Sequence, residues 1–119
     1  MLDSEEKGIS RSEMSDAERR LRSRLVQLLS RHGVLRGALS VRMRSCGKAG
    51  CKCLRGERHR AVYLVYRERG RYRQVFIPRR QEIRARRWVS RYQEVQELLE
   101  SLSVMNLERL KRKDGGGGV

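Results

Sequence analysis

The sequence has no long apolar run, few acidic residues in its central part, and only three cysteines. No stretch approaches the ~20 apolar residues that a membrane-spanning helix needs. The first residues are acidic and polar rather than signal-like. An odd number of cysteines without a signal segment argues against a disulfide framework. We therefore expect a soluble cytoplasmic protein with no membrane partner and with unpaired thiols.

Carboxylates are scarce where basic residues are dense. Residues 19–91 carry 23 basic and three acidic groups, whereas residues 1–18 have a net charge of −4 and residues 92–119 a net charge of −1. The three acidic groups fall on a loop, a turn and the start of a helix: Glu57, Glu68 and Glu82. Metal-dependent hydrolysis of nucleic acid needs converging carboxylates or histidines. We therefore expect a protein that is not an enzyme.

The excess of positive charge consists mainly of arginine. Of the 29 basic residues, 24 are arginine, and the net charge is +15. The planar guanidinium group binds phosphate through two parallel hydrogen bonds, although a GC-rich genome also enriches arginine. A charge of +20 over residues 19–91 exceeds what solubility requires. It indicates a polyanionic partner, of which nucleic acid is the commonest.

All three cysteines lie within eight residues, in the pattern C-x4-C-x-C-x5-H. Three thiolates and one imidazole form the tetrahedral ligand set of a structural zinc site, and basic neighbours favour the thiolate. We predict a zinc-knuckle loop over residues 46–59, with zinc bound by Cys46, Cys51, Cys53 and His59. One alternative is a cysteine cluster without metal. Another is a fourth ligand from water or an acidic side chain, with His59 contacting a phosphate.

The periodicity predicts an α+β fold: an N-terminal helix, a three-stranded antiparallel sheet with the zinc-knuckle loop between its first two strands, and a long C-terminal helix. The first helix begins at the Ser15–Glu18 capping box and ends before Gly33. We expect a disordered N-terminus (1–14), a single zinc-stapled basic domain (15–112) and a flexible tail (113–119). The predicted elements are a helix at 15–32, a strand at 37–45, the zinc loop at 46–59, a hairpin at 61–77 and a helix at 79–112.

Arg69-Gly70 predicts a two-residue hairpin turn, which pairs residues whose numbers sum to 139. One face is aliphatic and should lie on the helices: Val62, Leu64, Tyr66, Arg73, Val75 and Ile77. The other mixes rings with arginine: Tyr63, Val65, Arg67, Tyr72, Gln74 and Phe76. Exposed aromatic side chains beside arginine can stack bases and hold phosphates, so Tyr63 and Tyr72 are candidate stacking residues. The alternative is that Tyr63 and Phe76 are core residues or are packed over the zinc loop.

The C-terminal helix has an apolar stripe at spacings of three and four: Ala85, Trp88, Tyr92, Val95, Leu99, Leu102 and then Asn106. Packing of this stripe against the sheet and the first helix is the favoured interpretation. A helix of this length extends ~50 Å, which is longer than a body of this size covers. We therefore also hypothesise that its distal half forms a coiled-coil homodimer in which Asn106 sets the register.

The cysteine block, the tyrosine-rich hairpin and the arginine-rich helix resemble a small uncharacterised bacterial and archaeal family that is often linked to mobile elements. Its members run C-G-K-P-x-C-x-C, H-G-P-Y, Y-V-P and a tryptophan-centred helix ending near L-N-L. The matching positions here are Cys46–Cys53, His59–Tyr63, Phe76–Pro78, Trp88 and Asn106-Leu107. The resemblance covers residues 34–110 and departs from the family pattern at Ala49 and Arg60-Ala61. It implies a link to nucleic acid but no activity.

The sequence thus favours a nucleic-acid-binding module, with DNA slightly preferred over RNA because a basic helix face suits the major groove. A DNA-binding protein would be nucleoid-associated. The predicted phosphate contacts are Lys48, Lys52, Arg55, Arg58 and Arg60 near the cysteines, and Arg80, Arg84, Arg87 and Arg91 on the helix. The alternatives are an RNA-binding subunit of a ribonucleoprotein and a protein-docking accessory subunit of a transposition-type nucleoprotein complex.

Overall fold

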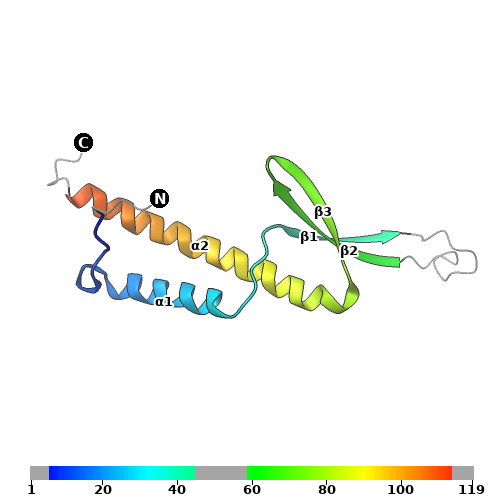
Figure 1. The fold of residues 1–119 in the computed structure, drawn as a ribbon, viewed down its shortest axis with the longest axis horizontal. Helices are drawn as coiled ribbons and strands as arrows, with labels where there is room; N and C mark the ends of the chain where they lie inside the picture. The colour runs from blue at the N-terminus through cyan, green and yellow to red at the C-terminus, as the bar shows by residue number, and fades with distance from the viewer. Residues whose placement is uncertain (1–5, 45–58, 114–119) are drawn as a thin grey trace, which may run out of the picture. The chain divides into compact units, whose positions relative to one another are not determined.

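The structure is a computed structural model and describes residues 6–44 and 59–113 of the chain. It has an N-terminal helix, a three-stranded antiparallel sheet of order β1-β2-β3 and a long C-terminal helix (Figure 1), which confirms the predicted α+β class. The predicted zinc-knuckle loop lies outside the described residues except for His59. The elements are η1 (Arg11–Glu13), α1 (Asp16–Ser30), β1 (Ala38–Arg44), β2 (His59–Glu68), β3 (Arg71–Ile77), η3 (Arg79–Gln81) and α2 (Glu82–Lys113).

The chain forms two compact units where the sequence predicts a single domain. The sheet unit, His32–Glu94, contains the three strands, η3 and the first part of α2. The helical unit, Met1–Arg31 with Val95–Val119, contains η1, α1 and the rest of α2. Each unit has buried side chains of its own.

The hairpin of the sheet unit has the predicted turn and register. Arg69 and Gly70 join β2 to β3 with φ angles of 50° and 81°, and a type I′ loop requires both angles to be positive. Tyr63 lies opposite Phe76, so the predicted sum of 139 is confirmed. This register separates an aliphatic face from a face of rings and arginines.

The aliphatic face supplies buried side chains to the sheet unit. On β2, Val62 is 0% exposed and Leu64 is also buried. Ala85 and Val89, about one turn apart on α2, are buried as well. The predicted burial of this face is therefore confirmed at Val62 and Leu64, whereas Val75 on β3 is 44% exposed.

Residues 33–35 approach the backbone and ring of Trp88 closely. The Leu35 amide donates a hydrogen bond to the Trp88 carbonyl at 3.0 Å. A Cβ atom on Gly33 would lie 2.7 Å from Cζ2 of the indole. Because α1 ends at Ser30 with Arg31 as its cap, the prediction that Gly33 stops the helix is wrong. The missing side chain instead leaves room for the indole.

The helical unit packs α1 against the distal part of α2, as the favoured interpretation of the apolar stripe predicts. Its core is Leu25, Leu28 and Val95, with Leu21, Leu98 and Leu102 packed against them. At the start of α1, the Ser15 hydroxyl accepts a hydrogen bond from the Glu18 amide at 3.1 Å, which confirms the predicted cap. Leu99 was predicted on the buried stripe, but it is 50% exposed.

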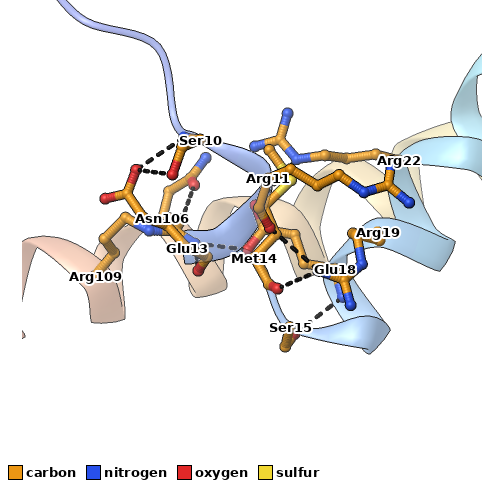
Figure 2. A network of polar contacts seen from close by, with 10 residues as sticks. All are labelled: Ser10, Arg11, Glu13, Met14, Ser15, Glu18, Arg19, Arg22, Asn106 and Arg109. Carbon is orange, nitrogen blue, oxygen red and sulfur yellow. Dashed lines mark hydrogen bonds and ion pairs between the residues drawn. The ribbon is translucent and has the colours of Figure 1, made fainter.

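Within the segment 1–14, for which the sequence predicts disorder, the structure has a short 3-10 helix, η1, with Ser10 and Met14 as its caps. Ser10 and Glu13 form a capping box, in which the Ser10 amide donates to Glu13 Oε2 at 2.8 Å (Figure 2). Arg19 donates to the Met14 carbonyl at 3.0 Å, and Arg109 donates to the Glu13 carbonyl at 3.1 Å. The S-x-x-E signal is present in the sequence, but hydrogen bonds from the nearby Arg19 and the distant Arg109 also hold the turn.

Glu18 is a buried carboxylate at the centre of this polar network (Figure 2). Its carboxylate oxygens lie 2.8 Å from Nη2 of Arg109 and 3.0 Å from Nε of Arg22. The hydrogen bond from Arg109 lowers the pKa of the Glu18 carboxyl, and Arg22 adds to this effect, while burial opposes it. Arg109 also donates to Asn106 Oδ1 at 3.0 Å. The network therefore joins α1 to the end of α2.

Candidate nucleic-acid interface

Positive charge is concentrated in the sheet unit. Residues 32–94 contain 18 basic and four acidic residues, a net charge of +14, and the rest of the chain contains 11 basic and 10 acidic residues, a net charge of +1. The described part of the sheet unit has fourteen arginines but three glutamates. Glu82 pairs with Arg60 at 2.5 Å, and Glu68 pairs with Arg73 at 3.5 Å. Most arginines of this described part therefore have no carboxylate to neutralise them.

The second face of the sheet is open. Phe76 is 54% exposed and Tyr72 is 72% exposed, while Tyr63 is half-buried. Phe76 is therefore not a core residue. Residues directly opposite one another in antiparallel strands share a face. Among the residues whose side chains the structure describes, this places ten here: Ala38, Ser40, Arg42, Ala61, Tyr63, Val65, Arg67, Tyr72, Gln74 and Phe76. We call this surface the ring face.

A three-residue cluster crosses all three strands of the ring face. The guanidinium carbon of Arg42 on β1 lies 4.6 Å from the ring centroid of Tyr63 on β2. Tyr63 meets Phe76 on β3 edge to face, with centroids 5.8 Å apart. A guanidinium over a ring is attracted to the π electrons, and cross-strand aromatic pairs stabilise a sheet. In this cluster Tyr63 lies between the cation of Arg42 and the exposed ring of Phe76.

A second cation–ring pair lies next to the hairpin turn. Arg67 and Tyr72 are direct cross-strand partners, and the Arg67 guanidinium carbon is 5.1 Å from the Tyr72 centroid. Tyr72 and Phe76 are four residues apart on β3, so they share a face. The ring face therefore carries two exposed rings, Phe76 next to Tyr63 and Tyr72 next to Arg67.

The predicted phosphate-binding arginines differ in their surroundings. Three are exposed: Arg80 in η3, and Arg84 and Arg87 in α2. Arg91 is half-buried, and its guanidinium donates to the Gly33 carbonyl at 2.8 Å. Arg60 is paired with Glu82. The exposed Arg84 also has its guanidinium carbon 5.6 Å from the ring centroid of Trp88. Three of the five predicted arginines in the described residues thus have intramolecular partners, and Arg80 and Arg87 are exposed.

The predicted metal ligands Cys46, Cys51 and Cys53 lie outside the described residues, as do Lys48, Lys52, Arg55 and Arg58. The backbone of His59 is described, and it begins β2 opposite Arg44 of β1. Over residues 6–44 and 59–113, no three histidine, cysteine, aspartate or glutamate side chains gather as a metal site. The zinc prediction is therefore untested, but Arg44 and His59, the residues that flank segment 45–58, are paired in the sheet.

Sequence reasoning missed part of the ring face. It placed Arg67 and Phe76 there but proposed stacking only for Tyr63 and Tyr72. It did not include Arg42, which alternates with the aliphatic residues Val41 and Met43 of β1. Alternation alone could not supply this residue, because its position also depends on how β1 pairs across segment 45–58. The strand order and register provide that information.

These features define a small α+β protein with a basic, open-faced sheet. The chain belongs to the family DUF6788, described as a domain of unknown function, whose model matches residues 14–87. The match spans α1, the three strands and the start of α2. No curated protein and no solved structure matches the chain. None of the helices in the described ranges has the length and apolar character needed to cross a membrane.

Proposed function

We propose that this protein binds nucleic acid through its sheet unit. The observation that carries this proposal is the separation of charge, +14 on residues 32–94 against +1 on the remainder. Arginines close together on a small unit repel one another, and this repulsion is relieved when phosphates replace their counterions. The guanidinium groups are also suited to phosphate geometry.

The proposed phosphate contacts come from two parts of the sheet unit. The exposed arginines of η3 and α2 are Arg80, Arg84 and Arg87. The basic residues of segment 45–58 are Lys48, Lys52, Arg55 and Arg58, as the sequence predicts. Arg60 and Arg91 have intramolecular partners, so we assign them to positioning these elements.

DNA is the first candidate ligand, because an exposed arginine row on a helix suits the major groove and the family resemblance suggests mobile elements. RNA is the second candidate. It is favoured by the exposed rings beside arginine on the sheet, an arrangement that suits unpaired bases. The third candidate function is protein docking in a larger nucleoprotein complex. The exposed apolar side chains of the helical unit support it.

The helical unit has exposed apolar side chains on both helices: Val26, Leu29, Leu99, Leu107 and Leu110. We propose that they pair with a second copy of this chain, as in a four-helix bundle. The helical unit has a net charge of only +1, so two copies meet without the repulsion that two sheet units would experience. Sedimentation equilibrium should show a dimer at micromolar concentration, and a monomer mass would contradict this.

We also propose a structural zinc ion bound by Cys46, Cys51, Cys53 and His59. The pairing of His59 with Arg44 supports this ligand set. Cys46 is two residues after Arg44, which limits its Cα to roughly 7 Å from that of Arg44. Protein purified without chelators should contain one zinc per chain, and the absence of zinc would overturn the assignment.

Nucleic-acid binding is tested by purifying the full chain at low salt and digesting any bound nucleic acid separately with DNase and RNase. We expect nucleic acid with the wild-type protein and much less with Arg80→Gln/Arg87→Gln. The matched control is Arg20→Gln/Arg31→Gln, which removes two exposed charges from the helical unit. Equal losses in both variants would show that net charge, and not the sheet unit, governs binding.

A further inference from the structure

The ring face has a composition that separates it from an ordinary protein contact surface. Besides its rings and arginines, it contains mainly small or polar residues: Ala38, Ser40, Ala61 and Gln74, with Val65 as its one larger aliphatic residue. The centre of a protein–protein interface is depleted of charged residues. Here guanidinium groups lie over two of the three rings, with Arg42 at 4.6 Å from Tyr63 and Arg67 at 5.1 Å from Tyr72.

We infer that the ring face binds the unpaired bases of a single-stranded nucleic acid, with Phe76 and Tyr72 as its two stacking rings. This rests on the proposed function and specifies its substrate class. Aromatic rings accept any base because every base has a π face. In a single strand, each base is attached to a backbone that carries a phosphate. The rings of this face can therefore stack on the bases while the neighbouring arginines bind the phosphates.

The geometry assigns stacking to Phe76 in place of Tyr63. Tyr63 is half-buried, and Arg42 lies over its ring. Phe76 meets Tyr63 at an interplanar angle of 68° and stays 54% exposed. Tyr63 is thus a positioning residue on the neighbouring strand, and its ring fixes the orientation of the Phe76 ring.

The two stacking rings are separate positions along one strand. Phe76 lies four residues after Tyr72 on β3, a distance of ~13 Å at the rise of a β-strand. This spacing requires a strand that extends along β3 and turns two of its bases toward the sheet. A duplex cannot do this without losing its own base stacking, so single strands are the preferred ligand.

The probes are four labelled nucleic acids of twelve residues: oligothymidine, oligouridine, an abasic DNA strand and a DNA duplex. The abasic strand has the same phosphates as oligothymidine but no bases. We expect the full chain to bind oligothymidine or oligouridine at least about tenfold more tightly than the abasic strand. The tighter of the two identifies DNA or RNA as the source of the bases.

The variants are Phe76→Leu and Tyr72→Leu, which keep an apolar side chain but remove the ring. Each should reduce the preference for base-bearing strands by about fivefold to tenfold and leave abasic binding unchanged. The matched control, Gln74→Ala, lies between them on the same face and should keep the preference. Circular dichroism and thermal unfolding verify that each variant is folded.

Equal affinity for oligothymidine, oligouridine and the abasic strand would overturn the base-stacking site while leaving nucleic-acid binding intact. A duplex bound as tightly as the single strands, with no effect of the leucine variants, would also overturn it. Absence of binding to all four probes would overturn the proposed function itself.

Discussion

Replacement of Glu18 by glutamine is expected to destabilise the helical unit strongly. The Glu18 side chain is 3% exposed and that of Arg109 is 13% exposed, so the change leaves a buried guanidinium without its counter-charge. Removing one partner of a buried ion pair costs about 3–5 kcal/mol. Arg109 keeps its hydrogen bonds to Asn106 and to the Glu13 carbonyl, and the pair with the more exposed Arg22 adds little. We therefore expect a loss of about 2–3 kcal/mol.

The assay is thermal and urea unfolding followed by circular dichroism, with the exposed Glu97→Gln as a control on the same unit. A loss of this size lowers Tm by roughly 10 °C. Because the pKa of Glu18 is lowered from 4.5 in the folded chain, its charge stabilises the fold above that value. This stabilisation is lost as the pH falls through the lowered pKa. The difference between wild type and Glu18→Gln should therefore be full near neutral pH and shrink in acid below 4.5.

Two results would refute this reasoning about Glu18. One is a Tm difference no larger than that of Glu97→Gln. The other is a difference that persists unchanged at a pH where the Glu18 carboxyl is protonated. Either would mean that packing, and not charge, accounts for the effect of the substitution.

Three further substitutions test the sheet unit, each read by its Tm against wild type. Gly33→Ala should lose about 1–3 kcal/mol, because its Cβ would overlap the Trp88 ring; an unchanged Tm would contradict the close approach. Gly70→Ala should lose about 1 kcal/mol, because φ is +81° but no atom lies within 4 Å of the new Cβ; a larger loss would point to a contact that this turn lacks. Arg91→Met should lose about 1–2 kcal/mol by leaving the Gly33 carbonyl unpaired, and the exposed Arg87→Met should lose little. Equal effects would contradict the positioning role of Arg91.

The parts of the fold that local chemistry determines were predictable from the sequence. Arg69 and Gly70 specify a two-residue turn, and this turn alone determines the pairing of β2 with β3 and the division of the hairpin into two faces. The Ser15 cap likewise marks the start of α1 within one residue. In both cases the signal and its effect lie within a few residues of one another.

The features that depend on long-range contacts were not predictable. Gly33 lies against the indole of Trp88, which is 55 residues later in the sequence. From the sequence alone, a glycine that makes room for this ring cannot be distinguished from a glycine that ends a helix. Residues 10–13 form their turn with help from Arg109, which lies at the far end of α2. Asn106 was predicted to set a coiled-coil register, but its side chain accepts a hydrogen bond from Arg109, which also donates to Glu18, 91 residues away in the sequence.

The candidate site divides in the same way. Hairpin alternation assigned Tyr63, Tyr72 and Phe76 to one face, but the exposure of each ring depends on what the other elements leave uncovered. The sequence also identified the arginines of α2 without showing that Arg91 turns to a backbone carbonyl. The zinc ligands are specific in their spacing, and they remain a prediction for metal analysis to test.

The measurement that tests nucleic-acid binding most directly is the affinity of the full chain for labelled oligothymidine as a function of salt concentration. If about five phosphates are contacted, the slope of log K against log salt should be about −3.5 for a single strand. Arg80→Gln/Arg87→Gln should make this slope shallower by about one to two units, and Arg20→Gln/Arg31→Gln should leave it unchanged. A slope near zero in the wild-type protein would contradict phosphate binding by the sheet unit.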